Sequence, residues 1–399
     1  MNNKKIIIVT ECFYPEQFNI NELASSWKDM GYDVDVLTLF PSYPVGKILP
    51  GYKNRFFGKE IYNGIGIYRV FAVTGYKDNK FKKLLKYINF MIFGSIVAAL
   101  IGRKYDYIFG FNVGALTDMV PAVVIKKLYR KPLMLWVQDV WPESIYAYGF
   151  KKTRVLSGFL NSFVKFMFNN VTSIAISGEG FENKLRPYVK KNISFNYLPN
   201  WAIKLNNNIE EIKLSDETRV HFTFAGNIGK VQNLENIIRA FNMLSNEYQS
   251  KAQLNIVGDG SSLKELKEIS LHNKNVVFHG LKKEKEMAKF YKASDFLIVS
   301  LIDIPIFSVT VPAKTQTYIA AKKPILAIIN GDTADIIRNN KLGLCVNPSD
   351  LGLIHDTFQD CINMNESEKM AFLRNNDQLL NQLFNKDKII NNLTKILVQ

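Results

Sequence analysis

The sequence predicts an α/β fold made of two doubly wound, Rossmann-like domains. An apolar run over 4–10, a helical pattern over 22–30 and a second apolar run over 33–40 form a strand–helix–strand unit, which is right-handed in a parallel sheet. The same pattern restarts with an apolar strand at 220–225. At 399 residues the chain is also too long for one ordinary core, so two domains are expected.

A polar connector separates the two predicted domains. Residues 204–215 are rich in Asn, Glu and Lys, which is typical of a segment between domains. We therefore predict a first domain over 1–203 and a second over 204–379, with a helix at the end of the chain within 380–399.

The net charge of +15 is concentrated in the first half of the chain. Residues 1–200 hold 27 Lys and Arg against 14 Asp and Glu, a net +13, whereas residues 201–399 hold 24 against 22, a net +2. The first half is therefore expected to face an anionic partner. Because its positive charges alternate with long aliphatic stretches and not with aromatic stacking platforms, an anionic membrane surface is favoured over nucleic acid.

Two basic, apolar helices in the first half are candidates for that membrane surface. Residues 87–102 carry no charge, but a membrane span needs about 20 apolar residues, so we expect either a buried helix or one lying at the bilayer interface. A second helix over 151–169 combines basic and large apolar side chains, in a stretch with no acidic residue from 144 to 178. The flanking cations of the first helix are predicted to face lipid headgroups or a molecule bound at the membrane surface: Lys80, Lys82, Lys83, Lys86, Arg103 and Lys104.

The three cysteines, Cys12, Cys345 and Cys361, form no close pair and no metal-ligand spacing. This pattern argues against a disulfide framework or a zinc site and is typical of a reducing cytosol. We expect a cytoplasmic protein without a bound metal.

The stretch over 133–144 holds the candidate catalytic residues. It begins as an uncharged apolar strand and then breaks into a loop with Asp139 and Glu143, with Pro142 ending the strand. In open α/β sheets, ligands bind at the carboxyl ends of the strands, so both carboxylates are candidates for acid–base work. The alternative is that Asp139 caps the next helix.

Glycine-containing loops follow the strands of the second half. The loop after 220–225 offers candidates for binding a phosphate-bearing donor: Asn227, Gly229, Lys230 and Gln232. Gly258 and Asp259 follow the next strand, and His279 ends the one after it. Backbone N–H groups in such loops favour phosphate. Neither half contains G-x-G-x-x-G or a Walker A sequence, which disfavours a dinucleotide oxidoreductase or an NTPase.

Hydroxyl, amide and cationic side chains crowd into the segment 305–324. A diphosphate leaving group needs such donors, because charge grows on it as its bond to a sugar breaks. The candidates here are Ser308, Lys314, Thr315, Gln316 and Thr317. The alternative is that Thr315 and Gln316 cap a helix whose lysines are solvated.

The motifs V-Q-D-V-W-P-E-S, F-P-S-Y-P-V-G-K, G-N-I-G-K-V-Q and V-P-A-K…Y-I-A-A-K-K-P-I, taken together, resemble glycosyltransferase family 4. More narrowly, they resemble its branch of WbuB-like fucosaminyl transferases of bacterial O-antigen and capsule assembly. Two positions depart from the family pattern: Thr317 stands where a glutamate is usual, and Lys322 where a glycine is usual.

The resemblance implies a GT-B fold, with two Rossmann-like domains facing across a cleft and a last helix that crosses back to the first domain. It also implies transfer of a sugar, such as N-acetyl-L-fucosamine, from a UDP-sugar with retention of configuration and without a metal. The acceptor would be a polyprenyl-diphosphate-linked saccharide at the inner face of the cell membrane.

In this interpretation Asp139 accepts the acceptor proton or orients the acceptor, with Glu143 as the second candidate. Lys230 and Lys314 stabilise the departing diphosphate, and Gln232 and Thr317 contact the donor. Two alternatives stay open: a UDP-sugar 2-epimerase of the same fold, and a non-enzymatic protein that binds an anionic surface.

Overall fold

The computed structural model describes residues 4–44, 46–76, 80–147, 149–202, 205, 212, 214 and 218–399, and only the backbone of Lys80, Lys83, Glu284 and Lys285. The chain divides into two compact units. The first comprises Met1–Pro199 with Asp387–Gln399, and the second comprises Asn200–Lys386. Residues 203 and 204, at the predicted domain boundary, lie outside the described part of the chain.

The first unit is built on an eight-stranded sheet with the order β3-β4-β2-β1-β5-β6-β7-β8. Every neighbouring pair is parallel except β3 and β4, which form an antiparallel hairpin at the sheet edge. The strands are β1 (Lys5–Thr10), β2 (Asp33–Leu39), β3 (Phe57–Tyr62), β4 (Ile65–Val70), β5 (Tyr107–Asn112), β6 (Leu133–Val137), β7 (Ser173–Ile176) and β8 (Phe195–Tyr197).

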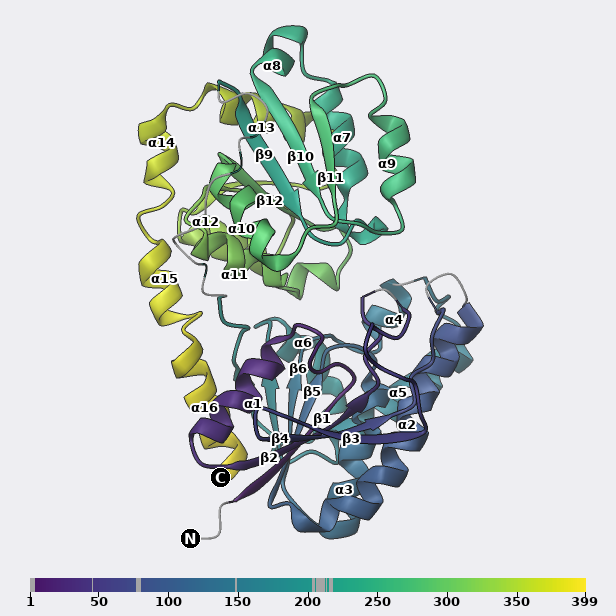
Figure 1. The fold of residues 1–399 in the computed structure, drawn as a ribbon. Coiled ribbons are helices and arrows are strands. Elements are labelled where there is room, and N and C mark those ends of the chain that lie inside the picture. The colour runs from purple at the N-terminus through teal and green to yellow at the C-terminus, as the bar shows by residue number, and fades with distance from the viewer. Residues whose placement is uncertain are drawn as a thin grey trace. The chain divides into compact units, whose positions relative to one another are not determined.

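Helices lie against this sheet (Figure 1). In α1 the buried residues Ile20, Leu23, Ala24 and Trp27 recur at helical spacing, so one stripe faces the sheet. The helices of the first unit are α1 (Asn19–Asp29), α2 (Lys80–Ile101), α3 (Val120–Tyr129), α4 (Glu143–Ala147), α5 (Arg154–Phe168), α6 (Phe181–Leu185) and α16 (Lys386–Val398).

The C-terminal helix α16 is part of the first unit although it follows the second unit in the sequence. It lies beside α1 (Figure 1), where the Trp27 Nε1–H donates to the Thr394 hydroxyl oxygen at 2.7 Å. Its buried residues are Ile389, Ile390, Leu393 and Leu397. The last helix therefore completes the core of the domain that begins the chain.

The second unit has a six-stranded, fully parallel sheet with the order β11-β10-β9-β12-β13-β14. Numbered within the unit this order is 3-2-1-4-5-6, which is the Rossmann arrangement with its switch point between β9 and β12. The strands are β9 (Val220–Ala225), β10 (Ala252–Val257), β11 (Val276–Gly280), β12 (Phe296–Ser300), β13 (Ile325–Ile328) and β14 (Gly343–Val346).

Helix α7 shows how the second core forms, because Leu234, Ile237, Ile238 and Phe241 lie on one face and are all buried. The helices of this unit are α7 (Leu234–Asn242), α8 (Asn246–Ser250), α9 (Leu263–Ile269), α10 (Glu284–Ala293), α11 (Ala313–Ala320), α12 (Asp332–Asn339), α13 (Leu351–Asn363), α14 (Glu366–Ala371) and α15 (Asn376–Gln382). Two parallel α/β units are the architecture predicted from the sequence.

Candidate functional site

In the first unit, a pocket lies at the point where the strand order reverses. The strand order turns between β1 and β5, and the loops after β1, β5 and β6 meet there, as expected for a ligand site in an open α/β sheet. The pocket measures about 160 Å³. Its lining residues are Glu11, Lys86, Tyr87, Val113, Gly114, Ala115, Asp139, Trp141, Ile145 and Phe150.

Asp139 reaches this pocket from the end of β6. Its Oδ1 accepts a hydrogen bond from the Val140 backbone N–H at 3.0 Å and lies 2.5 Å from the Ser144 hydroxyl oxygen, while Oδ2 has no protein partner among the described residues. Burial raises the pKa of Asp139 to about 6, although the hydrogen bonds from Ser144 and Val140 oppose this rise. A carboxylate with one fixed oxygen, one open oxygen and a pKa near neutrality is suited to proton transfer.

Glu11, which no sequence pattern singled out, forms a buried ion pair with Lys86 at the same pocket. Gly114 makes room for it, since a Cβ at that position would lie 2.8 Å from Glu11 Oε2. Burial acts to lower the pKa of Lys86, but the Glu11 carboxylate outweighs it and the pKa is raised. Asp118 lies next to this pair, and its burial together with the Glu11 charge raises the pKa of Asp118 well above the ordinary value.

The placement of Lys86 contradicts the prediction that it faces lipid headgroups. Its side chain is 17% exposed, and its ammonium group also lies over the Tyr76 ring, 4.3 Å from the ring centre. Helix α2 turns this one lysine inward, so that it lines the Asp139 pocket.

Aromatic rings line the pocket beside these charged groups. Tyr87 and Trp141 pack edge to face with their ring centres 6.1 Å apart. Sugars present both hydroxyl groups and an apolar face of C–H bonds, so a wall that combines carboxylates with aromatic rings has the chemistry to bind a sugar.

Glu143 does not line this pocket in the structure. It starts α4, its Oε2 is buried without a hydrogen-bond partner in the described part of the chain, and burial raises its pKa. Asp139 is therefore better placed than Glu143 to meet a ligand in this pocket.

In the second unit, the loops after the neighbouring strands β9 and β10 contact each other. The Ile228 N–H donates to the Asp259 carbonyl oxygen at 2.9 Å. Gly258 has φ +143°, and a Cβ there would lie 1.9 Å from the Gly226 carbonyl oxygen, so no larger residue fits. These contacts bring the predicted donor loops around Asn227 and Asp259 together.

Lys314 points from the start of α11 toward the loop after β9. A Cβ placed on Gly226 would lie 3.2 Å from the Lys314 Nζ, which shows how close the ammonium is to that loop. The Nζ is buried, has no hydrogen-bond partner among the described residues and lies 3.5 Å from the centre of the Phe224 ring. Burial lowers the pKa of Lys314 to about 7. A buried ammonium without a counterion is a ready site for an anion.

The other predicted residues of α11 divide into two groups. The Thr315 Oγ1 is buried without a partner, like the neighbouring Lys314 Nζ. In contrast, the Thr317 hydroxyl donates to the Ala313 carbonyl oxygen at 3.3 Å. With its amide turned so that the nitrogen faces the backbone, Gln316 donates to the carbonyl oxygens of Pro312 and Ala313, each at 3.0 Å. Thr317 and Gln316 therefore bond to carbonyl groups of their own helix. The capping alternative for Thr315 and Gln316 is wrong, because no side chain caps this helix and Lys314 is buried.

Lys230 is exposed at the end of the β9 loop and lines a smaller pocket of about 140 Å³ with Gly229, Ser262 and Glu265. Gln232 organises this loop, because its Oε1 accepts from the Gly229 N–H at 3.0 Å and lies 3.5 Å from the Asn227 amide nitrogen.

Two predicted donor residues are engaged elsewhere. The Ser308 hydroxyl donates to the Pro305 carbonyl oxygen at 2.9 Å. The His279 Nε2 lies 2.8 Å from the Asn255 Oδ1, inside a polar network of the sheet, and burial lowers the pKa of His279. Both therefore already have a hydrogen-bond partner within the protein.

The remaining cations of the membrane prediction lie at the ends of α2. Lys82 and Arg103 are exposed, and Lys104 pairs with Asp35 at 2.8 Å while remaining 43% exposed. The side chains of Lys80 and Lys83 lie outside the described residues. In the described part of the chain no group of three or more His, Cys, Asp or Glu side chains is arranged to hold a metal ion, and metal-free chemistry stays a prediction.

Comparison with known proteins agrees with this architecture. Residues 206–377 match the family model for glycosyl transferases group 1. The chain is 26% identical over 231 residues to the probable glycosyltransferase WbjE of Pseudomonas aeruginosa. That alignment covers 54% of this chain and 56% of WbjE, so it spans about half of each protein.

Three solved structures are similar along almost the whole chain. Sucrose-phosphate synthase from Thermosynechococcus elongatus has a TM-score of 0.76 at 14% identity, covering 99% of this chain and 98% of that one. The α,α-trehalose 6-phosphate synthase of Burkholderia multivorans has 0.73 at 12%, covering 99% and 96%. HepE of Anabaena, in complex with UDP and glucose, has 0.70 at 12%, covering 99% and 100%. The chain has the GT-B fold, and the family match and the WbjE relative support the prediction that it is a glycosyltransferase.

Proposed function

We propose that this protein is a retaining glycosyltransferase that moves a sugar from a UDP-sugar to a polyprenyl-diphosphate-linked saccharide in O-antigen or capsule assembly. The observation that carries the proposal is the buried, unpaired Lys314 ammonium beside the glycine loops of the second unit. A buried cation without a counterion is costly, and a donor diphosphate would supply the missing negative charge.

The donor belongs to the second unit in this proposal. Lys314 and the Thr315 hydroxyl would contact the diphosphate, and the N–H groups of the loops after β9 and β10 would add hydrogen bonds. Exposed Lys230 would add a second positive charge. The complex of the similar HepE structure with UDP and glucose supports a UDP-linked donor. With two lysines to stabilise the leaving diphosphate, the reaction needs no metal ion.

The acceptor sugar belongs to the pocket of the first unit. Asp139 would hydrogen-bond the reacting hydroxyl through its open Oδ2, while Oδ1 stays fixed by Val140 and Ser144. In a retaining reaction on one face of the sugar, the donor phosphate helps to take the proton, and Asp139 orients the hydroxyl or stabilises positive charge on the sugar. Tyr87 and Trp141 would contact the apolar face of the acceptor.

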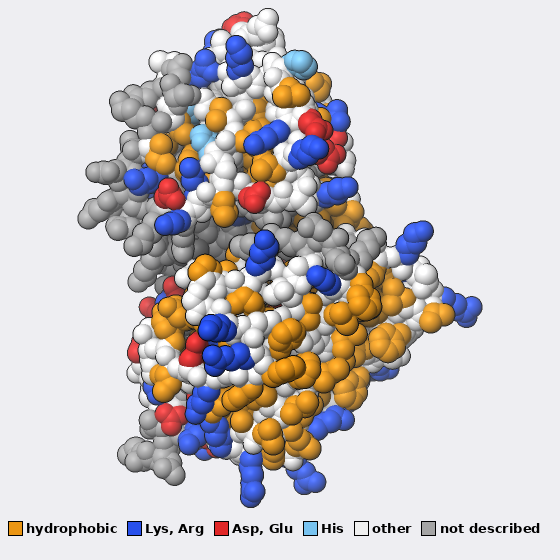
Figure 2. Space-filling view, turned by 45° about the vertical axis from the view of Figure 1, so that its right-hand side comes forward, with side chains coloured by type: hydrophobic (Ala, Val, Ile, Leu, Met, Phe, Trp, Pro, Cys, Tyr) orange, Lys and Arg blue, Asp and Glu red, His pale blue; other side chains and the backbone are white. Residues whose placement is uncertain are grey.

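An exposed apolar surface on the first unit supports a membrane-bound acceptor. Figure 2 shows hydrophobic side chains gathered in a broad patch with Lys and Arg side chains around it. Exposed residues of α2 and α5 that supply apolar surface are Phe81, Leu84, Leu85, Ile92, Ile96, Leu100, Val155, Phe159 and Phe166. Large contiguous apolar patches on a protein surface mark sites that contact a membrane or another protein.

Helix α2 is also the one helix, among the described residues, that is long and apolar enough to cross a membrane. The segment Leu84–Lys104, which includes most of α2, has a mean hydropathy of 1.9, and 22% of its most apolar stretch is buried. However, α2 packs against α3, since a Cβ on Gly94 would lie 2.9 Å from Pro121. We therefore propose that α2 lies on the membrane, as a helix with one packed face and one lipid-facing face, and that the protein works at the cytoplasmic side.

The finer assignments rest on the resemblance of the sequence motifs. The WbuB-like branch, and a donor such as UDP-N-acetyl-L-fucosamine, are the narrowest form of the proposal. The name of the WbjE relative agrees with a glycosyltransferase of this general kind.

The test is a transfer assay with purified protein, UDP-sugars and a membrane-embedded polyprenyl-diphosphate saccharide. UDP should be released only when donor and acceptor are both present, and the anomeric configuration of the donor should be retained. Epimerised UDP-sugar without UDP release would identify the 2-epimerase alternative. Absence of any UDP-sugar binding would contradict both enzymatic assignments and favour a non-enzymatic surface-binding protein.

A further inference from the structure

A large pocket of the first unit lies away from the residues that the sequence singled out. It measures about 610 Å³ and is formed by the loop before β3, by the β3–β4 hairpin and by the end of β2. Its lining residues are Phe40, Gly51, Tyr52, Lys53, Arg55, Gly58, Lys59, Glu60 and Arg69. We call it the hairpin pocket.

Positive charge dominates the hairpin pocket. Four of the nine lining residues are cations, and Glu60 is the one carboxylate. Glu60 is already paired with Arg69, at 2.6 Å. In the described part of the chain, no carboxylate pairs with Lys53, Arg55 or Lys59, which are all exposed. The pocket therefore carries about three uncompensated positive charges and favours a polyanion over a neutral ligand.

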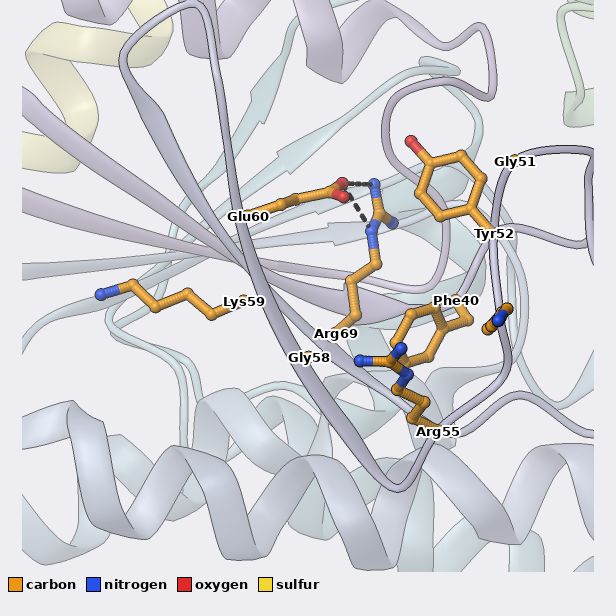
Figure 3. A pocket seen from close by; sticks show the side chains of 9 residues that line it. Phe40, Gly51, Tyr52, Arg55, Gly58, Lys59, Glu60 and Arg69 are labelled. Atoms are coloured by element: carbon orange, nitrogen blue, oxygen red, sulfur yellow. Dashed lines mark hydrogen bonds and ion pairs between the residues drawn. The ribbon is translucent and has the colours of Figure 1, made fainter.

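Buried Arg69 forms a fixed base for this pocket. Its side chain is 1% exposed, and its Nη1–H donates to the Leu39 carbonyl oxygen at 3.0 Å. Its Nη2 donates to the Tyr14 carbonyl oxygen, in the loop that follows β1. The Tyr52 ring covers the guanidinium, with 5.2 Å from Cζ to the ring centre. Figure 3 shows Tyr52, Arg55, Arg69 and Glu60 grouped together, whereas Lys59 extends away from them at the rim.

Exposed apolar side chains stand next to lining residues of this pocket in the chain. Phe56 and Phe57 come directly after Arg55 and are 74% and 49% exposed, and Ile61 of β3 is 75% exposed. Phe56 packs toward Phe93 of α2, with their ring centres 6.2 Å apart. The edge of the hairpin pocket is thus continuous with the apolar face of α2 that we assign to the membrane.

We propose that the hairpin pocket binds the diphosphate of a prenyl diphosphate lipid. Arg55 and Lys53 would contact the phosphate oxygens, since guanidinium groups match phosphate geometry. The prenyl chain would leave over Phe56 and Ile61 toward the bilayer. Apolar surface beside an unpaired polybasic pocket fits an amphiphilic anion, and a free phosphate would make no use of these exposed rings.

This inference deepens the proposed function and rests on its lipid-linked acceptor. It also assigns the sugar and the lipid diphosphate of the acceptor to two different sites of the first unit. The carboxylates and rings of the Asp139 pocket suit sugar hydroxyls, whereas the hairpin pocket suits the anchor that carries the sugar. Arg69 connects them, because it binds the backbone of the loop that begins at Glu11.

Calorimetry on the full chain tests the proposal with three probes in detergent: farnesyl diphosphate, inorganic diphosphate and farnesol. Wild type should bind farnesyl diphosphate more tightly than either other probe. The double variant Lys53→Gln with Arg55→Gln should weaken farnesyl diphosphate binding about 10-fold or more, the scale for losing charge-assisted hydrogen bonds. Its matched control, Lys190→Gln with Lys191→Gln, removes two exposed charges of the same unit outside the pocket and should bind as wild type does.

A second variant tests the apolar half of the site. Phe56→Ser with Ile61→Ser should reduce farnesyl diphosphate binding toward that of inorganic diphosphate and leave inorganic diphosphate unchanged. If wild type binds both diphosphates equally, the pocket holds free anions and the lipid assignment is overturned.

UDP binding and transfer to the lipid-linked acceptor, measured on the same preparations, separate the two proposals. If wild type transfers sugar but the charge variant binds farnesyl diphosphate normally, the hairpin pocket assignment alone is overturned. If wild type binds UDP but neither farnesyl diphosphate nor the lipid-linked acceptor, the lipid-linked acceptor itself is overturned.

Discussion

The ammonium of Lys314 lies 3.5 Å from the centre of the Phe224 ring, with no carboxylate or hydrogen-bond acceptor in contact among the described residues. The ring face offers a partial negative charge, which compensates a desolvated cation only in part. The pKa of Lys314, lowered to about 7 by burial, reflects that incomplete compensation. Ligand binding and stability should both respond to this residue.

Replacing Lys314 by Met should weaken UDP binding by about 1.5–3 kcal/mol, because a charge-assisted contact to the diphosphate is lost. In wild type the binding of UDP should also weaken as the pH rises above about 7, since the free protein then loses the proton. Calorimetry in buffers of different ionisation enthalpy should show proton uptake above that pH. Lys264→Met, at an exposed position of the same unit, is the control and should change neither quantity.

The same Lys314→Met substitution should stabilise the ligand-free protein. A lowered folded-state pKa means that the wild-type free energy of unfolding is reduced at pH 7 and below, and recovers as the pH rises from about 7 toward 10.5. We expect the variant to gain ~1–4 kcal/mol at pH 7 and to lack that rise. Urea unfolding at pH 7 and pH 10 measures both effects; a less stable variant at pH 7 would contradict the assignment of a strained cation.

Replacing Asp139 by Asn should lower turnover by about 10²-fold or more while UDP affinity stays near that of wild type. Wild-type turnover should rise through pH 6, where the Asp139 carboxyl ionises. Steady-state kinetics from pH 5 to pH 8 provide the measurement. Glu179→Gln removes an exposed negative charge from the same unit and should retain full turnover. Near-normal turnover of the Asn variant would transfer the catalytic assignment to Glu143.

Breaking the Glu11–Lys86 ion pair from one side should destabilise the first unit. Glu11→Ala leaves a buried ammonium without its partner, and such a change costs about 3–5 kcal/mol. The double variant Glu11→Gln with Lys86→Met removes both charges and should recover much of that loss. Chemical unfolding of the two variants gives the comparison, and equal losses in both would show that packing, not charge, sets the cost.

Substituting Ser for Ile92, Ile96 and Leu100 should abolish membrane association without unfolding the protein, because these side chains are 47%, 55% and 78% exposed. Co-sedimentation with vesicles containing anionic lipid should show binding by wild type that weakens as salt is added. Salt shortens the reach of electrostatic attraction, to about 8 Å at physiological ionic strength. UDP binding serves as the folding control. Wild type remaining in the supernatant at low salt would contradict the membrane assignment.

Much of the architecture was predictable because its strands are buried on both faces. Runs such as 133–137 and 220–225 are continuous and apolar, and parallel sheets require that pattern. The β3–β4 hairpin was missed because β3 lies at the edge and its residues alternate between exposed and half-buried. Its polar, aromatic sequence resembles a loop, and the hairpin pocket was missed with it.

The site was predictable only where a strand end gave a local signal. Asp139 follows an apolar strand directly, and the structure places it in a pocket. Its neighbours Glu11 and Lys86 lie 75 positions apart and meet because β1 occupies the centre of the sheet. The sequence could not predict that Lys86 points inward, because α2 is apolar around most of its circumference. Its hydrophobic periodicity therefore does not show which face of the helix is buried.

The backbone conformation of Lys322 explains why a glycine is usual at this position. Lys322 adopts φ +51°, in the left-handed region that glycine tolerates most easily. Its ion pair with Asp377 at 2.8 Å is exposed, so it offsets little of the conformational cost.

The assignment of α16 to the first unit has a consequence for biosynthesis. When the ribosome has made the first 199 residues, the apolar surface that Ile389, Ile390, Leu393 and Leu397 later cover is still open. The first domain must wait, incomplete, while the whole second domain is translated. A nascent chain that stalls before residues 387–399 are made therefore leaves an exposed apolar surface beside Trp27, and such truncated products are natural targets for chaperones and proteases.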